Sequence, residues 1–161
     1  MKTILFYKQR LGALLATGAL FFVFLAACNK DDNNNTSQMY TTSGNASGSQ
    51  QNPPVTTTGT ATLVGNFDAT TNVWQYSVSW TSLSSAATLI EIHGPADVGV
   101  NGNLLFSLSI TGGGVNGAAS STVTLSAQQE VDLLAGRLYY TIINAAHITG
   151  EVRGQIFATA Q

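Results

Sequence analysis

The sequence predicts an all-β domain, an antiparallel β-sandwich or flattened barrel with one short helix, after a signal peptide and a disordered tether. Three observations favour this fold class. Short β-prone segments are separated by turn residues throughout the second half of the chain. Residues 73–80 alternate between apolar and polar side chains, as in a strand with one buried face. Only 9% of the residues are charged, so Ser, Thr, Asn and Gln must cover many strand faces.

The first 27 residues have the pattern of a lipoprotein signal peptide. Three cations in the first ten residues precede an apolar run from Leu11 to Ala27, which ends in Leu25-Ala26-Ala27-Cys28. This tetrapeptide resembles a bacterial lipobox, in which fatty acid such as palmitate is attached and the cysteine becomes the new N-terminus. The alternative is an uncleaved anchor with an inert Cys28, although the run is short for a span of about 20 residues. Cys28 is the only cysteine, which excludes an intramolecular disulfide.

Residues 28–54 are predicted to be the lipidated cysteine and a flexible linker. From Asn29 to Pro54 the chain consists mostly of small polar residues, which cannot bury enough apolar area to offset the entropy of ordering. Lys30-Asp31-Asp32 resembles the export signal of surface lipoproteins, and a charged tripeptide in a solvated linker is the alternative. We therefore expect an outer-membrane lipoprotein of the cell envelope, held to the membrane by its N-terminal lipid and exposed at the surface if the signal acts.

The domain is predicted to span residues 55–161 as a succession of strands. The second strand should form a wall of the core, because Trp74, Tyr76, Val78 and Trp80 share one face. Gly94-Pro95 should end the third strand. The predicted strands cover residues 56–67, 73–80, 87–93, 104–110, 121–125, 138–143 and 151–158, and the fourth is expected to align Leu104, Phe106, Leu108 and Ile110 on one face.

One helix should interrupt the strands after residue 125. Ser126 followed by Gln129 suits a capping box, and Gly136 suits the end of the helix. The apolar stripe of this helix is predicted to consist of Val131, Leu133 and Leu134.

The last strand carries the segment Gly150-Glu151-Val152-Arg153-Gly154-Gln155-Ile156, in which Glu151, Arg153 and Gln155 should share one face. Two further segments precede it, Ile92-His93-Gly94-Pro95-Ala96 and Leu133-Leu134-Ala135-Gly136-Arg137-Leu138-Tyr139. In this order and spacing they resemble the CHRD family, first described in chordin and found in many bacterial secreted proteins. The resemblance implies a fold and a secreted location, and it carries no biochemical activity with it.

Two positions depart from the pattern of that family. The family normally has His-x-His where this chain has Glu91 and His93, and a further histidine where this chain has Ile143. Glu91 and His93 should point to the same face of their strand and could form half of a metal site. A structural, hydrogen-bonded His93 is the expectation we favour, with no metal and no cofactor, and His147 falls in the following loop.

Charge and motifs argue against several function classes. From Val55 onward two arginines stand against six acidic residues, a net charge of −4, so no basic face for nucleic acid can form. No Gly-x-Ser-x-Gly elbow occurs, so a hydrolase nucleophile is not indicated. The scattered acids show no pairing typical of glycosidases and are expected to be solvated; they are Asp97, Glu130, Asp132 and Glu151. The protein is predicted to be a non-enzyme.

The favoured function is a lipid-anchored, non-catalytic binding or adhesion module for an unidentified envelope or extracellular protein or glycan. The alternative is a metal-binding or superoxide-dismutase-like sandwich, for which two histidines in the domain are too few for a dinuclear site. A purely structural envelope component is a third hypothesis. Arg153 should either form a solvated pair with Glu151 or bridge its strand to a neighbouring loop, such as the one after His93. We expect the bridge, since Gly150 and Gly154 leave room for backbone to approach.

Overall fold

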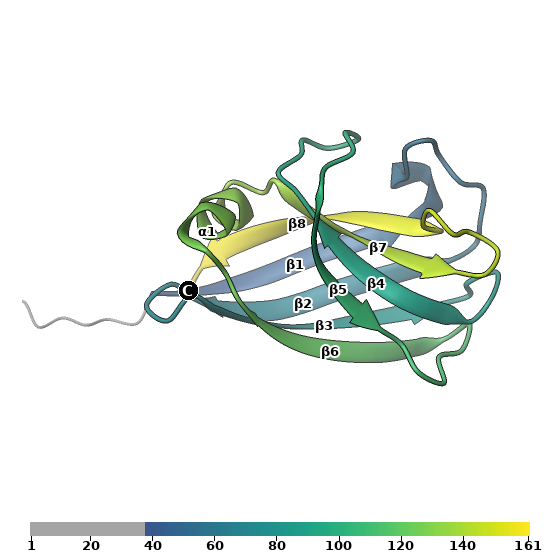
Figure 1. The fold of residues 1–161 in the computed structure, drawn as a ribbon, viewed down its shortest axis with the longest axis horizontal. Helices are drawn as coiled ribbons and strands as arrows, with labels where there is room; N and C mark the ends of the chain where they lie inside the picture. Colours follow the sequence, from purple (N-terminus) through teal and green to yellow (C-terminus); the bar gives the residue numbers. More distant parts are fainter. Residues whose placement is uncertain (1–37) are drawn as a thin grey trace, which may run out of the picture. The chain divides into compact units, whose positions relative to one another are not determined.

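The computed structural model describes residues 38–161, which form one antiparallel sheet of eight strands and a short α-helix. The sheet curls into a nearly closed barrel with the strand order β5-β4-β7-β8-β1-β2-β3-β6 (Figure 1). The all-β prediction with one short helix is therefore confirmed, in the form of a barrel. The elements are β1 (Met39–Ser47), the 3-10 helix η1 (Gly48–Gln50), β2 (Thr60–Asp68), β3 (Val73–Thr81), β4 (Ala87–His93), β5 (Leu104–Ser109), β6 (Gly117–Thr124), α1 (Ala127–Leu134), β7 (Leu138–Asn144) and β8 (Val152–Ala160).

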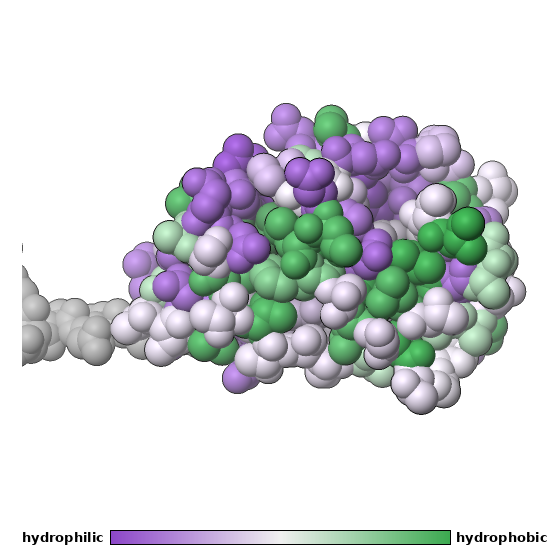
Figure 2. Space-filling model, viewed as in Figure 1, coloured by the Kyte–Doolittle hydropathy of each residue, from purple (hydrophilic) through white to green (hydrophobic). Residues whose placement is uncertain are grey.

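The two ends of the described chain meet in the middle of the sheet. β8 pairs with β1 along one side and with β7 along the other, so the last strand joins the first strand to the β4–β7 ladder. β5 and β6 are the two ends of the strand order. Partly buried apolar side chains from both of these strands pack against the core, and Figure 2 shows apolar surface over the region of β5. They include Leu105, Phe106, Leu108, Ala119 and Val123.

The alternation predicted for residues 73–80 is confirmed in β3. Its four predicted core residues are each at most 4% exposed, and they pack with Leu63 and Phe67 of β2. Trp74 donates its indole N–H to the hydroxyl of Thr42 at 3.0 Å, which satisfies both polar groups inside the barrel.

The predicted helix is also present, with its capping box. The Ser126 side chain accepts from the Gln129 amide, and the Gln129 side chain accepts from the Ser126 amide. Gly136 has φ +69°, a conformation that favours glycine after a helix. The predicted apolar stripe is wrong for Val131, which is 53% exposed, whereas Leu133 is fully buried. With only eight residues, the helix has about two turns.

The prediction of a flexible linker is wrong for residues 39–54. This stretch forms β1 and η1, and β1 lies between β8 and β2 with backbone pairing on both sides. Its inward positions are small or polar: Thr42 is bonded to Trp74, and Gly44 lies against the backbone of Gln155. Sheet hydrogen bonds and close backbone packing thus stabilise a strand whose composition resembles a linker. The domain accordingly begins near Met39 and not at Val55.

The predicted face of the fourth strand is wrong at Leu104. A register shift between Ile92 and His93 places Phe106 opposite Ile92 and Leu104 opposite His93, which leaves Leu105 as the extra residue of a bulge. Leu104 is consequently 53% exposed, and Leu105 packs against the core in its place.

The signal peptide, the lipobox cysteine Cys28 and the tripeptide Lys30-Asp31-Asp32 lie outside the described residues, as does the linker before residue 38. These predictions remain predictions. Within residues 38–161 no helix is both long and apolar enough to cross a membrane.

Candidate functional site

The family-like segments come together on the outer face of β4, β7 and β8. Strand register puts Thr141 between Glu91 and Arg153 in one row, and it puts Tyr139 between His93 and Gln155 in the next. We call these six side chains the motif face. Two loops cover it: the η1 loop (residues 48–59) and the β4–β5 loop (residues 94–103). Both lie at the upper edge of the view in Figure 1.

Arg153 links β8 to the β4–β5 loop, as the sequence led us to expect. Its guanidinium donates to the Val100 carbonyl at 2.7 Å and to the Asn101 side-chain oxygen at 3.0 Å. The guanidinium carbon lies 3.5 Å from the centre of the Tyr139 ring, a cation–π contact. The side chain is only 1% exposed, and burial lowers the pKa of Arg153 while Tyr139 opposes that shift. The alternative of a solvated pair with Glu151 is therefore wrong.

Gln155 and the η1 loop complete the attachment of the loops to the sheet. The Gln155 amide group donates to the carbonyls of Ala96 and Gly136, at 3.0 and 2.8 Å. Gln51 of the η1 loop donates to the Thr141 hydroxyl at 2.6 Å. The two loops also bond to each other through Asn52, whose amide donates to Gly99 O and whose carbonyl accepts from Asn101. Together these contacts tie both loops to the motif face and to each other.

Glu151 is a fully buried carboxylate just before β8, so the expectation that the acids are solvated is wrong for it. It accepts hydrogen bonds from the Thr57 hydroxyl, from the amide and hydroxyl of Ser84, and from the Asn144 side chain. Burial by itself would raise the pKa of Glu151, but these hydrogen bonds outweigh it and lower the pKa below its ordinary value. The same expectation is wrong for Asp132, which is 2% exposed and bonded to Arg137.

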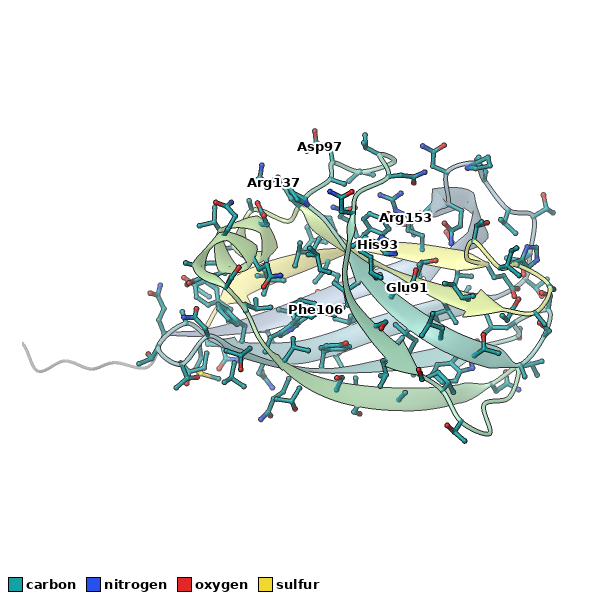
Figure 3. All side chains as sticks on the ribbon, viewed as in Figure 1. Glu91, His93, Asp97, Phe106, Arg137 and Arg153 are labelled. Carbon is teal, nitrogen blue, oxygen red and sulfur yellow. The ribbon has the colours of Figure 1, made fainter. Side chains whose placement is uncertain are left out.

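His93 has the structural, hydrogen-bonded role that we favoured. Its Nδ1 lies 3.1 Å from the Gly102 carbonyl and its Nε2 lies 2.9 Å from the Glu91 carboxylate, and the ring stacks on Tyr139 at 5.1 Å and 7°. His93 and Arg153, both labelled in Figure 3, belong to the strands on either side of β7, and both contact the Tyr139 ring.

Glu91 and His93, which were predicted as half of a metal site, are hydrogen-bonded to each other. Ile143 lies on the same outer face of β7, two residues after Thr141, which pairs with Glu91. It pairs with Leu89 and is therefore separated from His93 by four residues along β4. Within the described part of the chain no group of three His, Cys, Asp or Glu residues is arranged to hold a metal ion.

Gly154 lets the motif strand pack directly on its neighbour. A Cβ at this position would lie 2.7 Å from the Asn45 carbonyl and 2.8 Å from the ring of Tyr140. Tyr140 itself is fully buried, and its hydroxyl donates to the Gly44 carbonyl of β1 at 3.0 Å. The room predicted at Gly154 is therefore filled by backbone and by this aromatic ring, and the room at Gly150 is filled by the side chains of Thr141 and Gln51.

A cavity of about 360 Å³ remains between the two loops. Its lining includes Gln51 and Asn52 from the η1 loop, Val98 from the β4–β5 loop, and Arg153 and Gln155 from β8. The sequence indicated Arg153 and Glu151 but not the residues that bond to them and to Thr141. Gln51, Thr57, Ser84, Asn101 and Asn144 carry no local pattern, because each meets the motif only through the fold.

The comparison with protein families agrees with this arrangement. The family model of the CHRD domain matches residues 42–156, which contain the motif face and both loops. The chain belongs to the CHRD domain family. The match begins inside β1, in agreement with a CHRD domain that starts before residue 55. No curated protein and no solved structure shows significant similarity to the chain.

The low pKa of Glu151 predicts that the CHRD domain is acid-sensitive. A carboxyl whose pKa is lower in the folded state stabilises the fold above its unfolded pKa of about 4.3, and this contribution is lost as pH falls through the folded pKa. Denaturant unfolding between pH 7 and about 3 should therefore show a steeper loss of stability in the wild type than in Glu151→Gln, which has no charge to lose. Equal pH slopes in the two proteins would contradict this assignment.

Proposed function

We propose that the protein is a lipid-anchored component of the cell envelope that presents its CHRD domain as a non-catalytic binding or adhesion module. The observation that supports the binding part is that side chains of the motif face, together with the neighbouring Glu151, hold the loops of the domain in place. The charged groups of Arg153 and Glu151 are buried and bonded to loops of the same chain, and His93 is mostly buried and bonded likewise. Their chemistry orders the loops, and an ordered pair of loops on a rigid sheet is a common way to build a binding surface.

The surface of the β4–β5 loop supports the same proposal. Val98 and Val100 are 69% and 53% exposed, although the backbone of this loop is fixed by Arg153 and Gln155. Apolar side chains on an ordered, solvent-facing loop lose little entropy when a partner covers them. The partner would be an envelope or extracellular protein or glycan, and the β4–β5 loop and the η1 loop would contact it.

The anchoring part of the proposal rests on Leu25-Ala26-Ala27-Cys28 and on the position of β1. Ten residues separate Cys28 from Met39, so a lipid on Cys28 would hold the domain within about 40 Å of the membrane even with that segment fully extended. Surface exposure through Lys30-Asp31-Asp32 belongs to the same proposal.

Cells that express the protein and are fed labelled palmitate should incorporate the label into the wild type but not into Cys28→Ser. The variant lacks the thiol that carries the acyl chain, and it should accumulate as a larger, uncleaved precursor on a denaturing gel. Cys28 is the only cysteine, so label that persists in Cys28→Ser would contradict lipidation at this residue.

A further inference from the structure

Arg153 carries a buried positive charge without an acidic partner. Its hydrogen bonds go to a carbonyl and to an amide oxygen, and the face of Tyr139 covers its guanidinium. Among the described residues Arg137 forms an ion pair with Asp132 and His93 is hydrogen-bonded to Glu91, and neither contact includes Arg153. Buried charges in proteins are normally paired, so an unpaired guanidinium beside a cavity indicates a place for an anion.

The cavity above Arg153 has the size of a small-molecule site. Its volume of about 360 Å³ lies within the range of roughly 300–1,000 Å³ that is typical of ligand pockets. Arg153 and Gln155 are part of its lining, with the η1 loop on one side and Val98 and Gly99 on the other. Glu151 is the nearest acid in sequence, but its carboxylate is bonded to Thr57, Ser84 and Asn144 and not to Arg153. Figure 3 shows Asp97 in the β4–β5 loop, apart from Arg153.

The remaining polar groups of the cavity are mainly hydrogen-bond acceptors. Gln50, Gln51, Asn52 and Gln155 each use the amide nitrogen to hold the loops, and none of their side-chain oxygens accepts a hydrogen bond from the described chain. The oxygens of Gln51 and Gln155 are not among the fully buried, unpartnered atoms of this part of the protein, so solvent can reach them. Neutral acceptors of this kind suit the hydroxyl groups of a ligand.

We infer that this cavity binds a carboxylate attached to a hydroxylated skeleton, with a hexuronic acid unit of an acidic glycan as the ligand class. The carboxylate pairs with Arg153, and the ligand hydroxyls donate to the amide oxygens of Gln51, Gln155 and their neighbours. A single guanidinium matches a monoanion, and no Asp or Glu lines the cavity to receive the ammonium group of an amino acid. A wider hollow of about 700 Å³ over β1, β2, β3 and β6 is lined by uncharged side chains and offers no such charge.

This inference rests on the proposed binding function and names its ligand. The test is calorimetric titration of the purified full-length protein in detergent with galacturonate, with galactose as the neutral match and acetate as the bare carboxylate. Galacturonate should bind at least about tenfold more tightly than either, a difference of about 1.4 kcal/mol. Equal affinities for galacturonate and galactose would overturn the role of Arg153, and equal affinities for galacturonate and acetate would overturn the role of the hydroxyls. An absence of binding would overturn the inference as a whole.

Two variants locate the site without removing Arg153. Val98 is exposed at the cavity wall, so Val98→Trp should fill the cavity with little change in melting temperature and should abolish galacturonate binding. Val98→Ala is the matched control and should bind as the wild type does. Unchanged binding in a folded Val98→Trp would place any site elsewhere. Palmitate labelling is independent of this result, so the ligand assignment can fail while the lipid-anchored binding module stands.

Discussion

Replacement of Glu151 by alanine should destabilise the domain by about 3–5 kcal/mol and lower its melting temperature by about 10–20 °C. The carboxylate is fully buried and accepts from three residues that are far apart in the chain: Thr57 and Ser84 in loops and Asn144 at the end of β7. Alanine would leave the buried Asn144 side chain without this acceptor, at roughly 1–3 kcal/mol, and it would also remove the acceptor of Thr57 and Ser84, which lie nearer the surface. Water that enters the site would recover part of this loss. Thermal and denaturant unfolding of the purified full-length protein measure the effect.

Glu130→Ala is the matched control for this substitution. Glu130 is a partly exposed acid in the first turn of α1, so its loss should cost less than about 1 kcal/mol. The assignment of Glu151 as the central acceptor predicts a clear separation between the two variants. Similar melting temperatures for both would show that Glu151 is an ordinary acid.

Replacement of Arg153 by alanine should cost about 2–5 kcal/mol. The Val100 carbonyl and the Asn101 side-chain oxygen would lose their donor, at roughly 1–3 kcal/mol each, and the covered face of Tyr139 would lose its packing partner. The loss should concentrate in the β4–β5 loop, because both hydrogen bonds of the Arg153 guanidinium go to residues of that loop. Hydrogen exchange of the loop amides, with thermal unfolding of the whole domain, separates local from global effects.

Arg153→Lys is the best comparison for Arg153→Ala. Lysine keeps the charge and much of the stem but lacks the planar fork that serves two acceptors, so its cost should lie between those of wild type and alanine. Arg137→Ala is less suitable, because Arg137 pairs with the buried Asp132 and its removal carries a cost of its own. A melting temperature within about 1 °C of the wild type in Arg153→Ala would show that the bridge contributes nothing to stability.

The motif face explains how the family segments act together in this chain. Glu151 connects loops at one end of β8, whereas Arg153 and Gln155 hold the β4–β5 loop further along the same strand. On the opposite face of β8, Gly154 leaves room for the ring of Tyr140 in the core. The three family-like segments are thus neighbours in space because each contributes a strand or a covering loop to one layer of hydrogen bonds.

Elements defined by local patterns could be predicted from the sequence. The alternation of Trp74, Tyr76, Val78 and Trp80 identified β3 and its buried face, and the Ser126 and Gln129 pair identified α1 with its cap. The bounds of β4 were also predicted correctly, since Gly94-Pro95 follows its last residue. In each case the information lies within about ten residues, which is the range over which side-chain periodicity and capping act.

Tertiary structure alone decided the identity of β1 and the burial of Glu151 and Arg153. The composition of residues 39–47 is that of a linker, and only pairing with β2 and β8 turns that segment into a strand. Spacing predicted that Glu151 shares a face with Arg153 and Gln155, whereas in the structure Glu151 precedes β8 and bonds to Thr57, Ser84 and Asn144. Spacing also could not say whether water or protein covers these side chains. The covering loops come from residues 48–59 and 94–103, and their contacts with β8 span some 50 to 100 positions of sequence. Because such contacts depend on the closure of the whole barrel, no local pattern encodes them.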